Sequence, residues 1–190
     1  AKFDGVEIAN TIAKVIRAMP FPPPNSILGP EGESWIPVHG QVSLSNAPAM
    51  FAEIRAYFDS RAAEYEALGI HNGFLFSTLH NNAVVMEPVF FWPQGYRPVH
   101  ASMVEPEHLA RLKQLGEAAE ATRVVTESRE MVKRIAEKYG CAHFQIGRSY
   151  KYRDSRDEAF LRVLDAVKAV VDPKGTFNPG ALGFPEGPAA

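Results

Sequence analysis

The sequence predicts an α+β domain in which a ferredoxin-like antiparallel sheet carries its helices on one face. Three observations lead to this prediction: four segments have strand-like patterns, two helical segments lie among them, and their order is strand, helix, strand, strand, helix, strand. That order is the ferredoxin-like βαββαβ pattern. It places the first and third strands in the middle, the fourth beside the first, and the second at the other edge. A further helix is expected before this core, and a helix with an irregular tail after it.

The first 34 residues are expected to form a leading helix and a proline-rich linker. Apolar residues recur at helical spacing from Phe3 to Met19. Four of the five residues from Pro20 to Pro24 are prolines, which end the helix because proline lacks the N–H group that a helix needs. A polar loop with glycine and proline then leads into the core.

The core is expected over residues 35–147. Its strand segments alternate apolar and polar residues or are rich in β-branched and aromatic residues, and its helical segments repeat apolar residues every three or four positions. The predicted strands cover residues 35–44, 71–80, 83–92 and 141–147. The predicted helices cover residues 46–68 and 105–139, with a break of the second at residues 124–126 as an alternative. Asn81-Asn82 predicts a tight hairpin, because asparagine tolerates the positive φ of such turns.

Residues 148–190 are expected to hold the last helix and the tail. The helix is predicted over residues 155–171, where Phe160, Val163 and Val167 share one face. From Asp172 onward glycine and proline dominate, which predicts an ordered but irregular tail.

Composition and charge exclude several kinds of partner. The formal net charge is −2 and no basic tract is present, which argues against nucleic-acid binding. No apolar run reaches the roughly 18 residues of a membrane span and no signal peptide is visible, so a cytoplasmic location is expected. Cys141 is the only cysteine, which rules out an internal disulfide and a paired-cysteine metal site. The first residue is Ala1 instead of methionine, which indicates a fragment or a processed product.

The face of the sheet that lacks helices is expected to combine apolar side chains with histidines. By alternation along the strands, its apolar residues are Phe74, Phe76, Val85, Val89 and Phe91. Another domain, a second subunit or a ligand is expected to cover this patch, because contiguous apolar surface of this kind is rarely left in water. The polar residues expected on the same face include His39, Gln41, His143 and Gln145.

His39, Glu87 and His143 come from three adjacent predicted strands, and their side chains are expected to converge. Two imidazoles and a carboxylate on an apolar floor suit general acid–base catalysis or a divalent metal. Each histidine taken alone is more often a half-buried structural residue, and Glu87 has the alternative of an arginine partner. In a second arrangement His80 and Glu87 share an ion, but a tight hairpin would separate them by roughly 13 Å.

The C-terminal segment Val171–Gly180 (VDPKGTFNPG) closely resembles the ending of FAD-linked oxidases of the vanillyl-alcohol oxidase superfamily. That superfamily includes D-lactate and glycolate dehydrogenases and the cresol methylhydroxylase group. Three further segments resemble parts of the cap domain of these enzymes: Trp35–Gly40 (WIPVHG), Glu87–Pro93 (EPVFFWP) and Gln145–Tyr152 (QIGRSYKY). The resemblance covers nearly the whole chain, and the tail is its most specific part.

The resemblance implies that residues 1–190 are the C-terminal cap domain, also called the substrate domain, of a two-domain enzyme. An FAD-binding domain of the same polypeptide would hold most of the cofactor. The implied reaction is oxidation of a small alcohol or 2-hydroxy acid, or of a phenolic alcohol, with hydride transfer to the flavin. The isolated chain is then expected to be inactive.

The resemblance and the helix-free face together indicate roles for individual residues. His39 or His143 would accept the hydroxyl proton, and Glu87 would orient an imidazole or bind an ion. Arg148 would hold a substrate carboxylate through two hydrogen bonds. The other residues expected to contact substrate are Gln41, Gln145, Tyr150, Tyr152 and Phe76. The residues expected to border the flavin are Asn178, Pro179 and Gly180.

The chain departs from the family pattern in its metal ligands. His143 stands where many hydroxy-acid members have a metal-binding glutamate. The positions of their two metal-binding histidines correspond here to His80 and Glu87, without the glycine-rich loop. A divalent metal on His80, Glu87 and His143 is therefore only an alternative. The competing interpretation of the whole chain is a stand-alone ferredoxin-like module that binds a ligand or metal and forms a homodimer through its open sheet face.

Overall fold

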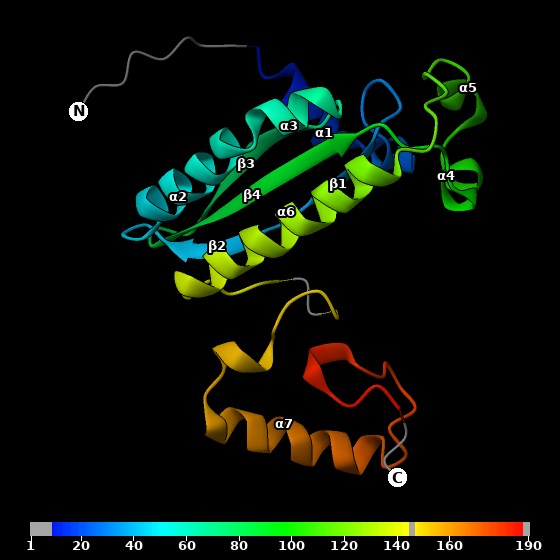
Figure 1. The fold of residues 1–190 in the computed structure, drawn as a ribbon. Helices are drawn as coiled ribbons and strands as arrows, with labels where there is room; N and C mark the ends of the chain where they lie inside the picture. Colours follow the sequence, from blue (N-terminus) through cyan, green and yellow to red (C-terminus); the bar gives the residue numbers. More distant parts are fainter. Residues whose placement is uncertain (1–8, 145–146, 188–190) are drawn as a thin grey trace.

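The computed structural model describes residues 9–144 and 147–187, and this part of the chain contains a four-stranded antiparallel sheet. Its strands are β1 (Ser34–Pro37), β2 (Gly40–Ser43), β3 (His71–Leu79) and β4 (Ala83–Trp92). β4 is central: β3 pairs with one edge, and β1 and β2 pair one after the other with the other edge. The helices of the core cover one face of this sheet, which confirms the predicted α+β class (Figure 1).

β1 and β2 are two halves of the one strand that the sequence predicts. Both pair with β4 in the same register, with Pro37 opposite Val89 and Gly40 opposite Met86. Between them the Val38 N–H donates to the Pro88 carbonyl at 2.9 Å, but Pro88 has no N–H to return the second bond of the pair. The ladder of hydrogen bonds is therefore interrupted, but the pairing register stays the same on both sides of the interruption. His39 accordingly lies opposite Glu87.

The predicted fourth strand is present only as an antiparallel bridge. Gln41 N–H donates to the Ala142 carbonyl at 2.8 Å, and Ala142 N–H donates back to the Gln41 carbonyl at 3.1 Å. The predicted position beside the first strand is confirmed, whereas the predicted length of residues 141–147 is wrong for the described residues. Residues 145–146 lie outside the described part of the chain.

Three helices cover the sheet: α2 (Ala47–Ser60), α3 (Ala62–Ala67) and α6 (Ala119–Lys138). The core between the layers includes Val38, Val42, Met50, Ile54, Phe58, Met86, Phe90, Val124 and Val132. The alternative of a helix break at residues 124–126 is wrong, because Val124 and Val125 are buried in the core and packing outweighs their weak helix propensity. The expected start of that helix at residue 105 is also wrong, since a loop separates α6 from α5 (Pro106–Leu109).

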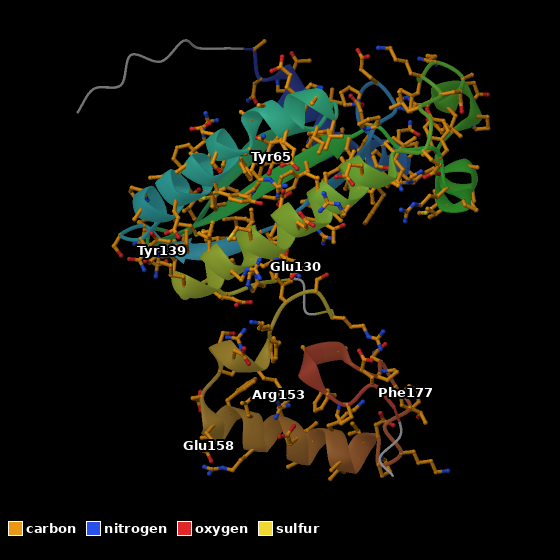
Figure 2. The ribbon with its side chains drawn as sticks, in the orientation of Figure 1. Tyr65, Glu130, Tyr139, Arg153, Glu158 and Phe177 are labelled. Atoms are coloured by element: carbon orange, nitrogen blue, oxygen red, sulfur yellow. The ribbon has the colours of Figure 1, made fainter. Side chains whose placement is uncertain are left out.

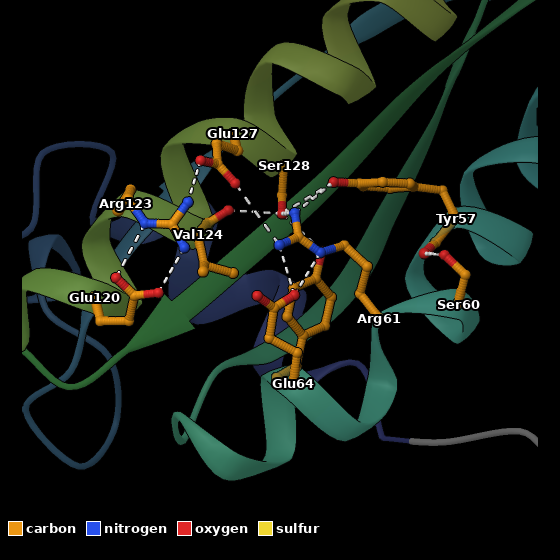
Figure 3. A network of polar contacts seen from close by, with 10 residues as sticks. Tyr57, Ser60, Arg61, Glu64, Glu120, Arg123, Val124, Glu127 and Ser128 are labelled. Atoms are coloured by element: carbon orange, nitrogen blue, oxygen red, sulfur yellow. Dashed lines mark hydrogen bonds and ion pairs between the residues drawn. The ribbon is translucent and has the colours of Figure 1, made fainter.

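A buried polar network joins the three covering helices (Figure 3). The Ser128 hydroxyl donates to the Val124 carbonyl at 2.8 Å, so it accepts from the hydroxyls of Tyr65 at 2.8 Å and Tyr57 at 3.3 Å. Arg61 in turn donates to the Tyr57 hydroxyl at 3.0 Å. Burial raises the pKa of Tyr65 to about 12, which keeps this phenol a donor at neutral pH. Because each of these groups is paired, the network has a structural role.

The hairpin between β3 and β4 corrects the predicted composition of the helix-free face. Its loop has three residues, 80–82, instead of two, so Phe76 lies opposite Met86 and Phe74 opposite Pro88. A register shift of one residue moves every side chain of a strand to the other face. Phe74 and Phe76 therefore pack against Phe51 of α2, with ring centroids 5.0 and 5.7 Å apart, on the helix side. The prediction that they lie on the helix-free face is wrong.

The remaining elements flank this core. They are α1 (Thr11–Ala18), η1 (Pro24–Ile27), α4 (Pro98–Met103), η2 (Arg153–Ser155), α7 (Glu158–Val171) and η3 (Ala181–Gly183). α7 begins after Asp157, whose side chain accepts the Phe160 N–H at 2.8 Å as an N-cap. Arg153 lies between α7 and the tail (Figure 2), where it donates two hydrogen bonds to the Asp165 carboxylate. In the described residues, no helix has the length and apolar composition that crossing a bilayer requires.

Candidate functional site

The structure brings His39, His143, Phe144 and Tyr150 together in what we call the His39 cluster. The His39 ring lies 3.9 Å from Phe144, 4.8 Å from Tyr150 and 5.6 Å from His143, measured between ring centroids. His143 stacks on Tyr150 at 3.9 Å. His39 alternates with Val38 and Val42, which face the helices, so its ring lies on the face that the helices leave open. Because Gln41 pairs with Ala142, alternation places Phe144 on that face and His143 on the other side, where the charges of Glu137 and Lys133 of α6 act on it. The prediction that His143 lies on the helix-free face is therefore wrong.

The hydrogen bonds of His39 define its tautomer. The Phe144 N–H donates to His39 Nε2 at 3.2 Å, so in the neutral ring the proton is on Nδ1. Nδ1 then donates to the Tyr150 hydroxyl at 3.2 Å, which also accepts the His39 backbone N–H at 3.0 Å. Both lone pairs of the Tyr150 oxygen are therefore used, and its own proton remains for another acceptor.

His143 is held in the tautomer that leaves a basic nitrogen. Its Nδ1 lies 2.7 Å from the His39 carbonyl oxygen, and because a carbonyl only accepts, Nδ1 carries the proton. Nε2 then holds the lone pair. Burial lowers the pKa of His143, which keeps the ring neutral near pH 7.

The same geometry gives hydrogen-bond partners to both ring nitrogens of His39. Its side chain is 1% exposed. Burial, with a smaller contribution from the charge of His143, lowers the pKa of His39 to about 4. Of the two histidines that the sequence offers as a base, His143 is the one whose geometry suits proton transfer.

Glu87 joins this group from the central strand. It lies opposite His39, and adjacent side chains across a strand pair on one face are within contact range. Burial raises the pKa of Tyr150, and the negative charge of Glu87 raises it further. Glu87 is half-buried, and no arginine forms an ion pair with it in the described residues, so the alternative of an arginine partner is not supported. His39 and His143 lie close together, whereas the convergence of Glu87 with them and the chemical roles of all three stay predictions.

The other predicted substrate residues have different surroundings. Phe76 faces the helices, as described above, and Tyr152 lies under the Arg156 guanidinium at 4.7 Å. Gln41 is half-buried beside the cluster and bonds Ala142 through its backbone. Gln145 lies outside the described residues. Of this set, Tyr150 alone belongs to the His39 cluster as described.

The tail residues that the sequence assigns to the flavin contact Arg148 instead. Arg148 Nε donates to the Pro179 carbonyl at 2.9 Å. Gly180 has φ +78° and lies so close that a Cβ atom would be 2.8 Å from Arg148 Nε, which explains a glycine there. Asn178 also has a positive φ, of 47°. A direct role of residues 178–180 in binding flavin stays a prediction.

Asp172 organises the start of this tail. Its carboxylate accepts the N–H groups of Thr176 and Phe177 at 2.9 and 3.0 Å and pairs with Lys168 at 2.5 Å. The Lys168 ammonium and these two N–H groups lower the pKa of Asp172 to about 2. The aspartate of the tail motif is therefore a structural residue.

Replacing Asp172 by asparagine is expected to loosen the tail, because the amide carries no charge for Lys168 and has one acceptor oxygen instead of two. Amide hydrogen exchange of Thr176 and Phe177 should become faster, measured by NMR or mass spectrometry. The Asp172 contribution to stability is complete above pH 3.8 and declines as the pH falls toward 2, so this decline should be missing in the variant. Asp59→Asn, at an exposed ion pair of α2, is the control and should leave the amide exchange rates of Thr176 and Phe177 unchanged. Equal exchange rates in wild type and Asp172→Asn would contradict the assignment.

The described residues do not form the alternative metal site. His80 lies in the hairpin turn, five positions along β3 from Leu75, the residue opposite Glu87, which corresponds to roughly 16 Å. Among the described residues, no three histidine, cysteine, aspartate or glutamate side chains are grouped closely enough to hold a metal ion.

Two residues that the structure places at candidate functional sites were not identified from the sequence. Phe144 stacks on His39 and donates to it through its backbone, and Arg129 borders a cavity described below. Phe144 directly follows His143 in the sequence, but no periodic pattern in the sequence indicates that its ring stacks on His39.

The fold and the cluster define an α+β domain with a ferredoxin-like sheet and two neighbouring histidines at the edge of that sheet. No family model and no curated protein matches the chain. Among solved structures, the chain is similar to alkyldihydroxyacetonephosphate synthase, with a TM-score of 0.44 and 14% sequence identity. The similarity covers 88% of this chain but only 23% of the synthase chain. It therefore does not show the activity of a longer protein that contains this domain.

Proposed function

We propose that the chain is the substrate domain of an FAD-dependent oxidoreductase that oxidises a small alcohol or 2-hydroxy acid, with a phenolic alcohol as one such substrate. The observation that carries the proposal is His143, a neutral imidazole with Nδ1 bound to the His39 carbonyl and Nε2 left as a base. The resemblance of the segments Trp35–Gly40 and Val171–Gly180 to FAD-linked oxidases supports the choice of cofactor.

The surroundings of the cluster fit a flat aromatic cofactor. Beside Glu87 on the helix-free face lie Val89 and Phe91, both half-buried, with Trp35 6.4 Å from the Phe91 ring. When bound, FAD supplies the acceptor for the hydride that leaves the carbinol carbon. An apolar floor next to fixed hydrogen-bonding groups is the usual construction of a site for such a ligand.

The roles of the chain's own residues follow from their hydrogen bonds. His143 Nε2 takes the proton of the substrate hydroxyl as the carbon–oxygen double bond forms. The Tyr150 hydroxyl, whose lone pairs are both used, donates its proton to the substrate oxygen and orients it. Arg148 holds a substrate carboxylate with the terminal nitrogens that the Pro179 carbonyl leaves unused. Gln41, Gln145 and Tyr152 complete the proposed substrate contacts.

An exposed apolar stripe on α7 supports a partner domain. Phe160, Val163, Val167 and Val170 are between 42% and 80% exposed, although they recur at helical spacing. Apolar stripes of this kind are normally covered. The proposed cover is the FAD-binding domain of the same polypeptide.

The test is to express the protein from its complete coding sequence and to compare it with the 190-residue chain. The full-length protein is expected to be yellow, and its flavin absorbance should bleach anaerobically with an alcohol or 2-hydroxy acid from a panel. The 190-residue chain is expected to be colourless, because most flavin contacts would lie outside it. Full-length protein that binds no flavin would refute the proposal, and flavin bound to the 190-residue chain alone would refute the proposed division of the site.

A homodimeric binding module is the second candidate, favoured by one observation. Leu75 lies opposite Glu87 on the helix-free face and is 52% exposed, so part of this face is uncovered in the monomer. Sedimentation of the 190-residue chain and of Leu75→Lys separates the two candidates. A dimer that Leu75→Lys dissociates, together with a coding sequence that begins at this chain, would favour the module.

A further inference from the structure

A cavity of about 310 Å³ lies where β1, the first half of α6 and the segment leading into α4 meet. Its volume is in the range of small-molecule binding sites. Trp35, Trp92, Gln94, Arg97, His100 and Arg129 are among the residues that line it. None of the residues that line it belongs to the His39 cluster, although the charge of Arg129 acts on Tyr150 of that cluster.

The cavity has an excess of positive charge that the protein does not balance. The guanidinium groups of Arg97 and Arg129 contribute to its walls, and no carboxylate does. Arg123, on the same helix as Arg129, pairs with Glu120 and Glu127. Within residues 9–144 and 147–187, by contrast, neither Arg97 nor Arg129 forms an ion pair. Two unpaired guanidinium groups at one cavity favour an anion.

One buried polar atom at the cavity lacks a partner in the described structure. Arg129 Nε is inaccessible to water and has no hydrogen-bond acceptor. Gln94, which is 6% exposed, also lines the cavity. Buried polar groups are nearly always paired, so unpaired ones at a cavity indicate a missing binding partner.

His100 adds a side chain whose tautomer is fixed. Its Nδ1 accepts the Arg97 backbone N–H at 3.2 Å, so the neutral ring carries its proton on Nε2. His100 is 9% exposed and lines the cavity, and its Nε2 proton has no acceptor among the described residues.

The remaining wall combines Ser34, Thr122 and Thr126 with aliphatic and aromatic side chains. Trp92 is 7% exposed, and its indole N–H is already bound to the Thr122 hydroxyl at 2.9 Å, so it offers the cavity ring surface instead of a donor. The Trp35 indole N–H is likewise bound, to the Ser26 carbonyl. A ligand that fits these walls has both an anionic group and an apolar part.

We propose that this cavity binds an amphipathic small-molecule anion, a carboxylate or a phosphate ester. Arg97 and Arg129 balance its charge, Gln94 and His100 donate hydrogen bonds to its oxygens, and Trp35 and Trp92 contact its apolar part. Planar guanidinium groups recognise both kinds of oxyanion through paired hydrogen bonds.

Titration of the 190-residue chain with phenyl phosphate, benzoate and inorganic phosphate tests the proposal. The chain has two tryptophans and both line the cavity, so tryptophan fluorescence and the two indole N–H signals in NMR spectra report on this site. Phenyl phosphate or benzoate is expected to bind more tightly than inorganic phosphate, because only the first two have an apolar part. Whichever of the two binds more tightly identifies the ligand class as phosphate ester or carboxylate.

Two variants and a matched control locate the binding. Arg129→Gln and Arg97→Gln are each expected to weaken binding roughly tenfold or more, the usual effect of losing a charge-assisted hydrogen bond. Arg123→Gln removes the same charge from α6 outside the cavity and is expected to change affinity less than about twofold. The exposed position of Arg97 keeps the test valid if Arg129→Gln unfolds. Absence of binding by all three probes up to about 10 mM, or equal weakening in all three variants, would overturn the proposal.

Discussion

Replacing His143 by asparagine is expected to lower the rate of substrate-dependent flavin reduction in the full-length protein by about 10²–10⁴-fold, the usual range for loss of a general base. The asparagine amide can still donate to the His39 carbonyl, as Nδ1 does in the wild type, but it offers no basic nitrogen. Stopped-flow absorbance of the flavin measures the rate. Because the backbone interaction is retained, the loss should be in the chemical step and not in folding.

The pH profile identifies the proton acceptor. Burial lowers the pKa of His143 below its usual value of about 6.5, so the wild-type rate should rise with pH and level off before neutrality as Nε2 loses its proton. His143→Asn should lack this rise. His108→Asn, on α5, is the control and should keep both the rate and the profile. A rate of His143→Asn within a few-fold of the wild-type rate would show that another group accepts the proton.

The stability of the chain is expected to fall by about 3 kcal/mol between pH 7 and pH 4 through His39 alone. Burial and the charge of His143 lower the pKa of His39 to about 4 in the folded state, against about 6.5 in the unfolded chain. The unfolded state therefore binds a proton first as the pH decreases. The contribution of neutral His39 to stability is complete above pH 6.5 and is lost as the pH falls toward 4.

Urea unfolding of wild type and His39→Asn at a series of pH values measures this effect. The variant should be less stable at pH 7, because it loses the ring contacts with Phe144 and Tyr150, and its stability should change less with pH. His143 and His100 also have lowered pKa values and add a dependence of the same sign in both proteins. The difference between the two curves therefore isolates His39. Parallel curves would show that His39 does not remain neutral in the folded state.

Local patterns were sufficient to predict most of the sheet. Alternation over residues 35–44 and 83–92 identified two adjacent strands and the faces of their side chains, because burial on one face requires a period of two. The order of elements then predicted the fourth segment beside the first strand, and the structure places Ala142 opposite Gln41 there. The first inference uses only the pattern of neighbouring residues, and the second uses the small set of topologies that such an order of elements allows.

The register of the β3–β4 hairpin could not be obtained in this way. Loops of two and three residues around Asn81-Asn82 are both compatible with local turn chemistry, yet they place Phe74 and Phe76 on opposite faces. Packing of these rings against Phe51 of α2 accompanies the three-residue loop. A contact with a helix more than twenty residues earlier is not encoded in the turn itself.

The sequence by itself determined the fold class, the positions of the long strands and the face of β4 on which Glu87 lies. Only the tertiary structure decided which of them act together: it placed Nδ1 of His143 on the His39 carbonyl, enclosed His39 between Phe144 and Tyr150, and left Arg129 unpaired at a cavity. The reason is physical. Periodicity reflects burial, which depends on the side of an element, whereas a tautomer, a pKa or a charge balance depends on single atoms contributed by distant segments.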